Sequence, residues 1–368
     1  MPEIYDVIVV GGGVVGAACA RELALTGRHV GMLEPGGARG QAWRASAGML
    51  APQIEGHPSD ALFDLGLAGR ELYPQLAADL KEATGIDIGL WQEGIAALAL
   101  DESDAARLRS TVAWQRQQGH LCDWLDTGEV RERFPWLGPC LGALWAPREG
   151  AVDPVPLVQA LRADAATHRA VLVEDEGVRI DRRGDRLVGV TGRRDRYMAD
   201  QVVVAAGAWS GLLEGLPRPL SVEPVRGQMA ALPWPAGIEP AIVYHRQCYL
   251  VARGREAIVG STMEYVGFDA AVTSAGLARI LSAAAVFYPP LKDLTVMRSW
   301  AGLRPTTPDG LPILGGEPRL EGLWYATGSG RHGILLAPIT AMLLRLMMNG
   351  QTPTEDLSAL RPERFWNW

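Results

Sequence analysis

The chain opens with a pattern of apolar positions that predicts a strand, a helix and a second strand. Residues 5–10 form an apolar, β-prone run that leads directly into glycines, as a fully buried strand would. Helical spacing follows at residues 14–26 and ends at Gly27. Residues 29–33 are again β-prone, and Glu34 follows them. The start of the chain therefore predicts a β-α-β unit, which is the unit of parallel sheets.

The rest of the pattern divides between helices and short strands. Helical spacing is found at residues 62–84, 103–118, 155–167, 277–287 and 333–348, and strand patterns at 95–100, 171–180, 201–205, 228–232, 248–252, 257–259 and 323–326. Asp153 and Pro154 suit the cap and first turn of the helix at 155–167. We expect an α/β (α+β overall) protein with a discontinuous Rossmann-like domain, residues 1–85, 146–220 and 305–368. The inserted substrate domain, residues 86–145 and 221–304, should be mostly antiparallel β.

Composition narrows the class of protein. With 368 residues, 48 % of them hydrophobic and 21 % charged, the chain can bury a core, and its length suits two domains. The net charge of -7 and the lack of a basic run argue against a nucleic-acid partner. The 4 cysteines show no metal-ligand spacing, so we expect reduced thiols, no metal and a cytoplasmic location. The apolar run at 334–348 is short and carries Arg345, so membrane insertion is not expected.

A glycine motif follows the first predicted strand. Residues 11–16 read Gly-Gly-Gly-Val-Val-Gly and match G-x-G-x-x-G, with Glu34 about 20 residues further on. Gly11 permits the tight turn, Gly13 lets the backbone approach a pyrophosphate, and Gly16 allows helix and strand to pack closely. The helix N-terminus attracts phosphates, and Glu34 is expected to accept hydrogen bonds from ribose hydroxyls. This context predicts a dinucleotide site, although the motif alone does not separate FAD from NAD.

Three later segments favour a flavin. Residues 44–50 are mostly small, so their backbone can lie against a flat ring. Residues 203–209 end a predicted strand in small residues, as expected where a chain passes close to a cofactor. Residues 328–334 lie at the start of the last predicted helix, whose N-terminus can stabilise negative charge on a reduced flavin. The expected cofactor is therefore FAD, and the discontinuous domain is expected to be an FAD-binding domain.

Several sequence blocks resemble those of one flavoprotein family and occur in the family's order. Besides the glycine motif, they are S-A-G-M-L at 46–50, A-A-G-A-W-S at 205–210, V-R-G-Q at 225–228, G-S-T-M at 260–263, W-A-G-L-R-P at 300–305 and G-I-L-L-A-P at 333–338. Together they resemble the FAD-dependent glycine oxidase/D-amino-acid oxidase family over essentially the whole chain. The best match within it is the bacterial glycine oxidase of the thiamine-pathway type.

The resemblance implies roles for individual residues. Arg304 matches the arginine that binds the substrate carboxylate, and Tyr249 matches the tyrosine whose hydroxyl faces the same carboxylate. Arg331 matches an arginine beside substrate and flavin, and Met49 and Met263 match residues that line the substrate cavity. The positions that match FAD contacts are Val14, Val15, Glu34, Pro35, Ala47, Gly48, Met49, Val178, Gly330, Arg331, His332, Gly333, Ile334 and Leu335.

The chain departs from the family pattern at five positions near the expected site. Gln247, which belongs to the expected substrate pocket, replaces a histidine, and His332 replaces an asparagine. Gly330 replaces a bulkier residue, and Ala42 and Trp43 replace small hydroxyl residues near the flavin. These differences leave the size of the substrate open.

The candidate residues suit binding and orientation of a substrate. Arg304 offers a carboxylate two parallel N–H groups, and Arg331 near a positive helix start suggests an anionic ligand, with phosphate binding or a salt bridge as alternatives. No catalytic triad, carboxylate pair or metal set stands out, which fits direct hydride transfer from the substrate Cα to flavin N5. Hydrolysis of the imine would give an oxo acid and ammonia, and oxygen would become hydrogen peroxide. In the sarcosine oxidases, which the resemblance includes as relatives, a cysteine near the C-terminal glycine-rich region carries the flavin. Residues 305–310 of this chain hold no cysteine, so FAD should be noncovalent.

Other functions remain open on the sequence alone. One is an amino-acid dehydrogenase of the same fold that passes electrons to a membrane quinone. A second is an oxidase of modified tRNA, which the acidic balance argues against. A third is a flavin carrier without turnover. Glycine, sarcosine, D-alanine and D-proline share the groups that the site would recognise, and a homo-oligomer, in particular a homotetramer, is implied only by the resemblance.

Overall fold

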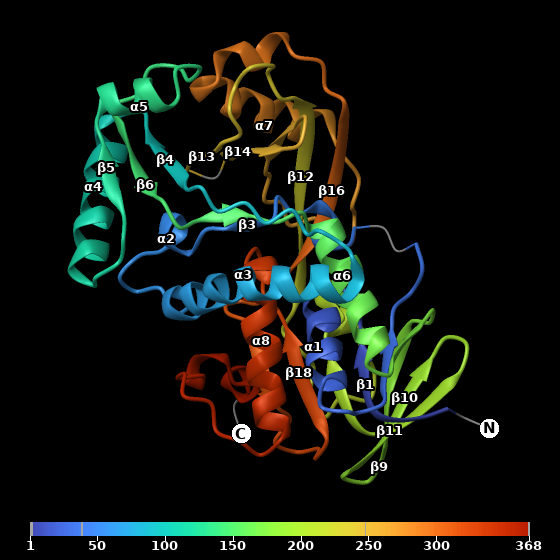
Figure 1. The fold of residues 1–368 in the computed structure, drawn as a ribbon. Helices are drawn as coiled ribbons and strands as arrows, with labels where there is room; N and C mark the ends of the chain where they lie inside the picture. The colour runs from blue at the N-terminus through green and yellow to red at the C-terminus, as the bar shows by residue number, and fades with distance from the viewer. Residues whose placement is uncertain (1–2, 38–39, 247, 367–368) are drawn as a thin grey trace.

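Two large sheets organise the molecule (Figure 1). The computed structural model describes residues 3–37, 40–246 and 248–366. The first sheet has eight strands in the order β17-β18-β11-β1-β2-β8, with β10 and β9 joined beside β11. Its strands are β1 (Ile4–Val10), β2 (Val30–Leu33), β8 (Ala170–Val173), β9 (Gly177–Arg183), β10 (Arg186–Gly192), β11 (Arg196–Val204), β17 (Ile313–Gly316) and β18 (Leu323–Thr327). The pairings that join β18, β11, β1, β2 and β8 are all parallel.

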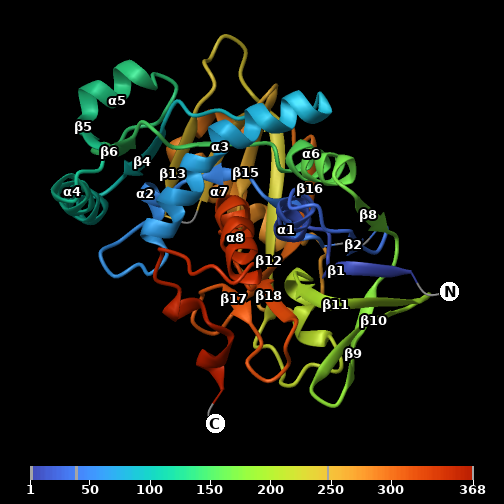
Figure 2. The ribbon, with the colours of Figure 1, turned by 60° about the horizontal axis from the view of Figure 1, so that its bottom comes forward.

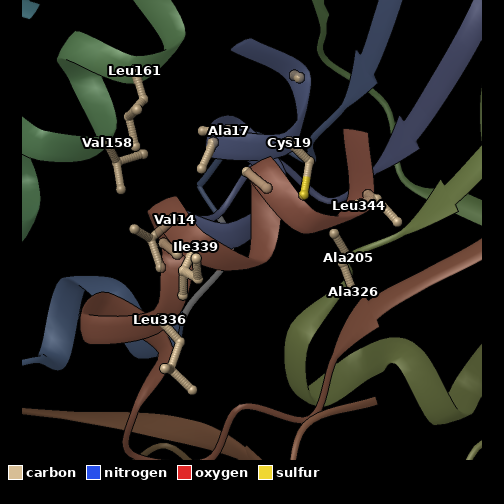
Figure 3. Packing of buried hydrophobic residues seen from close by; sticks show 14 of the residues in the cluster. Val14, Ala17, Cys19, Val158, Leu161, Ala205, Ala326, Leu336, Ile339 and Leu344 are labelled. Atoms are coloured by element: carbon tan, nitrogen blue, oxygen red, sulfur yellow. The ribbon is translucent and has the colours of Figure 1, made fainter. Parts of the chain in front are cut away.

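Helices pack against one face of this parallel sheet. They are α1 (Val14–Ala24), α3 (Phe63–Thr84), α6 (Pro154–Thr167) and α8 (Gly333–Met348). Small side chains on α1, such as Ala17 and Cys19, lie between apolar residues of α6 and α8, including Val158 and Ile339 (Figure 3). Because small residues let helices approach closely, α1 sits near the sheet with its N-terminus at the end of β1. The β-α-β unit predicted at the start of the chain is therefore confirmed.

The second sheet is mostly antiparallel. Its eight strands run in the order β16-β12-β15-β14-β13-β4-β6-β5, and only the β13–β4 pairing among those described is parallel. They are β4 (Ile95–Ala99), β5 (Asp123–Leu125), β6 (Gly142–Ala146), β12 (Glu223–Pro233), β13 (Ile242–His245), β14 (Cys248–Arg253), β15 (Glu256–Gly260) and β16 (Arg298–Thr306). Helices α4 (Glu102–Gln117), α5 (Thr127–Arg133) and α7 (Ser274–Phe287) pack against it, and Figure 2 shows α4 and α5 beside β5 and β6 at one edge of this sheet. The mixed α/β fold class is confirmed.

Smaller elements join the two sheets. The short strands β3 (Met49–Leu50) and β7 (Gly150–Ala151) pair with each other, and α2 (Pro52–Glu55) follows β3. The 3-10 turns are η1 (Ala42–Ala45), η2 (Gly207–Leu212), η3 (Pro289–Asp293), η4 (Ser358–Leu360) and η5 (Pro362–Phe365). No helix in the described part of the chain is long and apolar enough to cross a membrane.

One predicted strand is wrong in its extent. The run at 171–180 is two strands, β8 and β9, separated by residues 174–176. Asp175 is buried in the gap, and its carboxylate accepts hydrogen bonds from the backbone N–H groups of Arg193 and Arg194 and from the hydroxyl of Tyr197. This carboxylate closes a turn, so β9 pairs with β10 and cannot continue β8. The sequence pattern also missed β13 and β16 altogether.

Candidate active site

A large cavity lies where the carboxyl ends of the parallel strands meet the antiparallel sheet. It has a volume of about 1160 Å³, larger than the range of roughly 300–1,000 Å³ that holds a drug-sized ligand. Its walls come from the ends of β1, β2, β11 and β18 on one side, and from β12, β14 and β16 on the other. A cavity of this size and position suits an extended dinucleotide together with a small substrate.

The glycine turn forms one end of the cavity. Gly11 has a φ of 100°, and a Cβ there would lie 2.5 Å from the carbonyl oxygen of Ala205. A Cβ on Gly16 would lie 1.8 Å from the carbonyl oxygen of Gly11, so Gly16 serves the contact between helix and turn and does not line the cavity. Gly13 caps α1 without a side-chain hydrogen bond, and the first turn of α1 holds no acidic residue. The N–H groups of that turn therefore face the cavity ready for an anion.

Glu34 lies at the end of β2 and lines the cavity as predicted. Its Oε2 accepts a hydrogen bond of 2.7 Å from the backbone N–H of Gly12, and its Oε1 accepts one from Gln41. Arg162 on α6 lies 3.3 Å from Oε1 and also donates to the carbonyl oxygen of Gly12 at 2.6 Å. These contacts fix the carboxylate at the rim of the glycine turn, the position required of a ribose acceptor.

The middle of the cavity is lined by the loop before β3 and the start of α8. Gly48 has a φ of 76°, and a Cβ there would lie 1.9 Å from the carbonyl oxygen of Val152, so the turn requires glycine. Arg253 on β14 donates to the carbonyl oxygen of Ala47, which ties this loop to the second sheet. The remaining predicted cofactor residues that line this cavity are Val14, Val15, Pro35, Met49, Val178, Gly330, Arg331, His332, Gly333, Ile334 and Leu335.

Arg304 on β16 reaches into the far part of the cavity. Its Nη1 donates to the carbonyl oxygen of Thr262 at 3.0 Å, and its Nη2 donates to Ser261 Oγ at 2.6 Å. Among the described residues it makes no ion pair, and burial lowers the pKa of its guanidinium. A Cβ on Gly227 would lie 2.4 Å from Arg304 Nη2, so the guanidinium occupies the space that this glycine leaves. A desolvated arginine without a carboxylate partner is a site for an anionic ligand.

Tyr249 lies beside Arg304 on the same wall. It is buried on β14, and burial raises the pKa of its hydroxyl although Arg304 acts in the opposite direction. The position of a Cβ on Gly260 is 2.8 Å from the Tyr249 hydroxyl oxygen, so glycine again makes room for a polar group of the site. Met49 and Met263 line the same cavity, whereas Gln247 lies outside the described residues.

Arg331 has a partner that the sequence did not predict. Its Nε donates to Glu55 Oε2 on α2 at 2.9 Å, and the carboxylate outweighs burial so that the pKa of Arg331 rises. The sequence left an anionic ligand, phosphate binding and a salt bridge open for Arg331, and the structure contains the salt bridge. His332 Nδ1 lies 3.9 Å from the same Glu55 oxygen, and burial lowers the pKa of its ring. Glu55 and Tyr244 both line the cavity, and no motif pointed to either of them.

The buried carboxylate of Glu149 holds α2 in place. Glu149 is fully buried and accepts hydrogen bonds from the backbone N–H groups of Gln53 and Ile54. Burial raises its pKa to about 8. Because α2 carries Glu55, this contact sets the position from which Glu55 reaches Arg331.

Comparisons with known proteins agree over almost the full length. A family model described as FAD dependent oxidoreductase matches residues 6–346. The chain is 37% identical to the glycine oxidase of Geobacillus kaustophilus, over 97% of this chain and 96% of that protein. It is 34% identical to a bifunctional protein ThiO/ThiG of Trichormus variabilis, over 98% of this chain and 55% of that protein. The crystal structure of the Geobacillus glycine oxidase superposes with a TM-score of 0.94 at 36% identity, covering 98% of this chain and 99% of that one.

Proposed function

The chain belongs to the family of FAD-dependent oxidoreductases, and from this premise we propose that it is an amino-acid oxidase acting on glycine or another small amino acid. The reaction is an oxidative deamination. The substrate loses a hydride from Cα and a proton from its nitrogen and becomes an imine, which water converts to an oxo acid and ammonia, or an amine if the nitrogen is methylated. Oxygen takes up the electrons and is released as hydrogen peroxide.

FAD is the cofactor, and the residues of the cavity fit it. Substituting either Gly11 or Gly48 would place a Cβ against the backbone, and the uncapped start of α1 offers N–H groups to the pyrophosphate. When bound, FAD supplies the acceptor for the substrate's hydride. Glu34 would hold the ribose, residues 46–49 would lie against the ring system, and the start of α8 would approach it from the other side.

The observation that carries the proposal is the half-buried Arg304 guanidinium, which makes no ion pair with any described residue. A substrate carboxylate can accept two parallel hydrogen bonds from it, which fixes both the position and the orientation of the amino acid. Tyr249 lies on the same wall and would donate its hydroxyl to the same carboxylate. With the carboxylate held at this end, the Cα and the amine point toward the middle of the cavity where residues 46–49 lie.

The space around the rest of the substrate would be enclosed by the side chains of Met49, Met263 and Arg331. Two of these are flexible apolar side chains, which suit a small substrate without a charged side chain. Arg331 is partly exposed and already paired with Glu55, so we assign it to the entrance of the cavity rather than to the carboxylate. The amine would bind in its neutral form, with its proton lost on binding, so that no side chain has to remove a proton during hydride transfer.

The test is an amino-acid panel with hydrogen peroxide detection. Glycine, sarcosine, D-alanine and D-proline should give peroxide, and glycine should bleach the flavin absorbance under anaerobic conditions. Bleaching without oxygen consumption, together with reduction of a quinone dye, would instead indicate a dehydrogenase. No bleaching by any amino acid would contradict the proposal.

We propose further properties of the chain, namely its domain bounds, its assembly, its location and its pathway. We propose that residues 1–85, 146–220 and 305–368 form the FAD-binding domain, because all strands of the first sheet come from these segments. We also infer a homo-oligomer, to be tested by light scattering, and a cytoplasmic location, which the free state of the 4 cysteines supports. We also infer a role in thiamine biosynthesis, which the resemblance of the sequence to glycine oxidases of the thiamine-pathway type implies.

A further inference from the structure

Trp43 carries a buried polar atom that the protein does not satisfy. It lies on η1 and is 6 % exposed, and within the described residues its Nε1 has no hydrogen-bond partner. The indole N–H can only donate, so its partner must be an acceptor. Leaving a buried donor without an acceptor is costly, and such groups in folded proteins are nearly always paired with protein, water or ligand.

The edge of the indole that carries this N–H faces the glycine turn. A Cβ on Gly13 would lie 3.3 Å from Trp43 Cδ1 and 3.8 Å from Trp43 Nε1, and both residues line the cavity. Gly13 is the glycine that lets the backbone approach a pyrophosphate, and α1 starts there with no side-chain cap. The unpaired N–H and the free N–H groups of the helix therefore converge on one region.

Two arginines lie over the Trp43 ring, although neither lines the cavity, and they add positive charge near that region. The guanidinium carbon of Arg44 lies 4.2 Å from the centre of the Trp43 ring, and that of Arg162 lies 5.6 Å from it. Arg162 forms an ion pair with Glu34 at 3.3 Å, whereas Arg44 donates a hydrogen bond to the neutral side chain of Gln41. One positive charge beside the ring thus remains without an acidic partner among the described residues. The ligand group that meets all of these features is a phosphate.

We propose that the Trp43 indole N–H donates a hydrogen bond to the pyrophosphate of FAD. The proposal rests on FAD as the cofactor and adds a residue that the glycine motif does not contain.

The test measures FAD binding to apoprotein by equilibrium dialysis, with Trp43→Phe as the variant. Loss of a hydrogen bond to a charged group should raise the Kd for FAD roughly ten- to hundred-fold. The matched control is Trp324→Phe on β18, because Trp324 Nε1 is also buried without a partner but Trp324 does not line the cavity. The control should bind FAD like the wild type.

A phosphorus NMR spectrum of the bound FAD identifies the group that Trp43 contacts. The pyrophosphate signals should shift in Trp43→Phe and not in Trp324→Phe. If Trp43→Phe fails to fold, replacement of Trp43 by its benzothienyl analogue exchanges only the N–H for sulfur and should show the same two effects. An unchanged Kd in Trp43→Phe would mean that water satisfies the N–H of the wild type. A raised Kd with unchanged phosphorus signals would mean that Trp43 packs against another part of FAD. Either result overturns the proposal. A wild-type apoprotein that binds no FAD would contradict the cofactor itself.

Discussion

Substitution of Gly227 by alanine should displace Arg304 without removing it. The added Cβ would lie 2.4 to 2.5 Å from Cζ and the two terminal nitrogens of the guanidinium, whereas ordinary contacts begin near 3.4 Å. The guanidinium must therefore move by roughly 1 Å, which would break its hydrogen bonds to Thr262 and Ser261. Because the neighbour is the end of a flexible side chain, the fold should survive. A misplacement of roughly 1 Å in a positioning group can cost about 10²-fold in rate.

The assay compares kcat/KM for glycine with that for an amine that lacks the carboxylate. Gly227→Ala should lose about two decades with glycine, which is about 2.7 kcal/mol, and little with the amine. A double-mutant cycle gives the decisive comparison, because Gly227→Ala should cost nothing further once Arg304 is alanine. Full activity of Gly227→Ala on glycine would refute the reasoning. If Gly227→Ala lowers kcat/KM as much in the Arg304→Ala variant as in the wild type, then Gly227 acts through the packing of the β-sheet and not through Arg304.

The remaining predictions concern the carboxylate, the ribose, the attachment of FAD and pH. Arg304→Ala should lose two to four decades in kcat/KM at roughly 1.4 kcal/mol per decade, and Arg304→Lys should recover only part. Glu34→Ala should weaken FAD binding by about 1–3 kcal/mol in a titration of apoprotein. Denaturation should release all FAD, leaving a colourless chain. Burial raises the pKa of Glu149 to about 8 from 4.5, so the folded state keeps a proton that the unfolded chain releases. Thermal stability should therefore fall as pH rises between these values, and Glu149→Gln should flatten that slope.

The sequence predicted the parts of the site that depend on local backbone geometry. The glycines of the turn were recognisable because their spacing between a strand and a helix allows one conformation, and the structure shows the clashes that any Cβ would cause at Gly11 and Gly16. The helix at 154–167 was predictable for a similar reason, since Asp153 caps it and Pro154 occupies its first turn. The roles of Arg304, Tyr249 and Arg331 rested on the resemblance together with the general chemistry of arginine, and these roles stay predictions.

What the sequence could not predict depends on contacts between distant segments. Glu55 and Arg331 are 276 residues apart in sequence, and the four-residue helix that carries Glu55 is too short to leave a periodic pattern. The break between β8 and β9 likewise comes from Asp175, whose carboxylate binds backbone groups about twenty residues further along. A polar residue inside a β-prone run does not reveal such partners, because each of them is set by the tertiary fold.

The pairing of β12 with β16 explains why the carboxylate site depends on glycines that lie outside the cofactor motif. Gly227 lies opposite Gly302, and Arg304 follows Gly302 by two residues, so all three face the same side of the sheet. The guanidinium of Arg304 fills the space above Gly227, and a Cβ on Gly302 would lie 2.5 Å from the Cβ of Ala45 on η1. One glycine therefore admits Arg304, for which we propose carboxylate binding, and the other admits the segment that carries Trp43. A shift of one residue in this pairing would turn Arg304 to the opposite face, so the register of these two strands determines whether the cavity can bind a carboxylate.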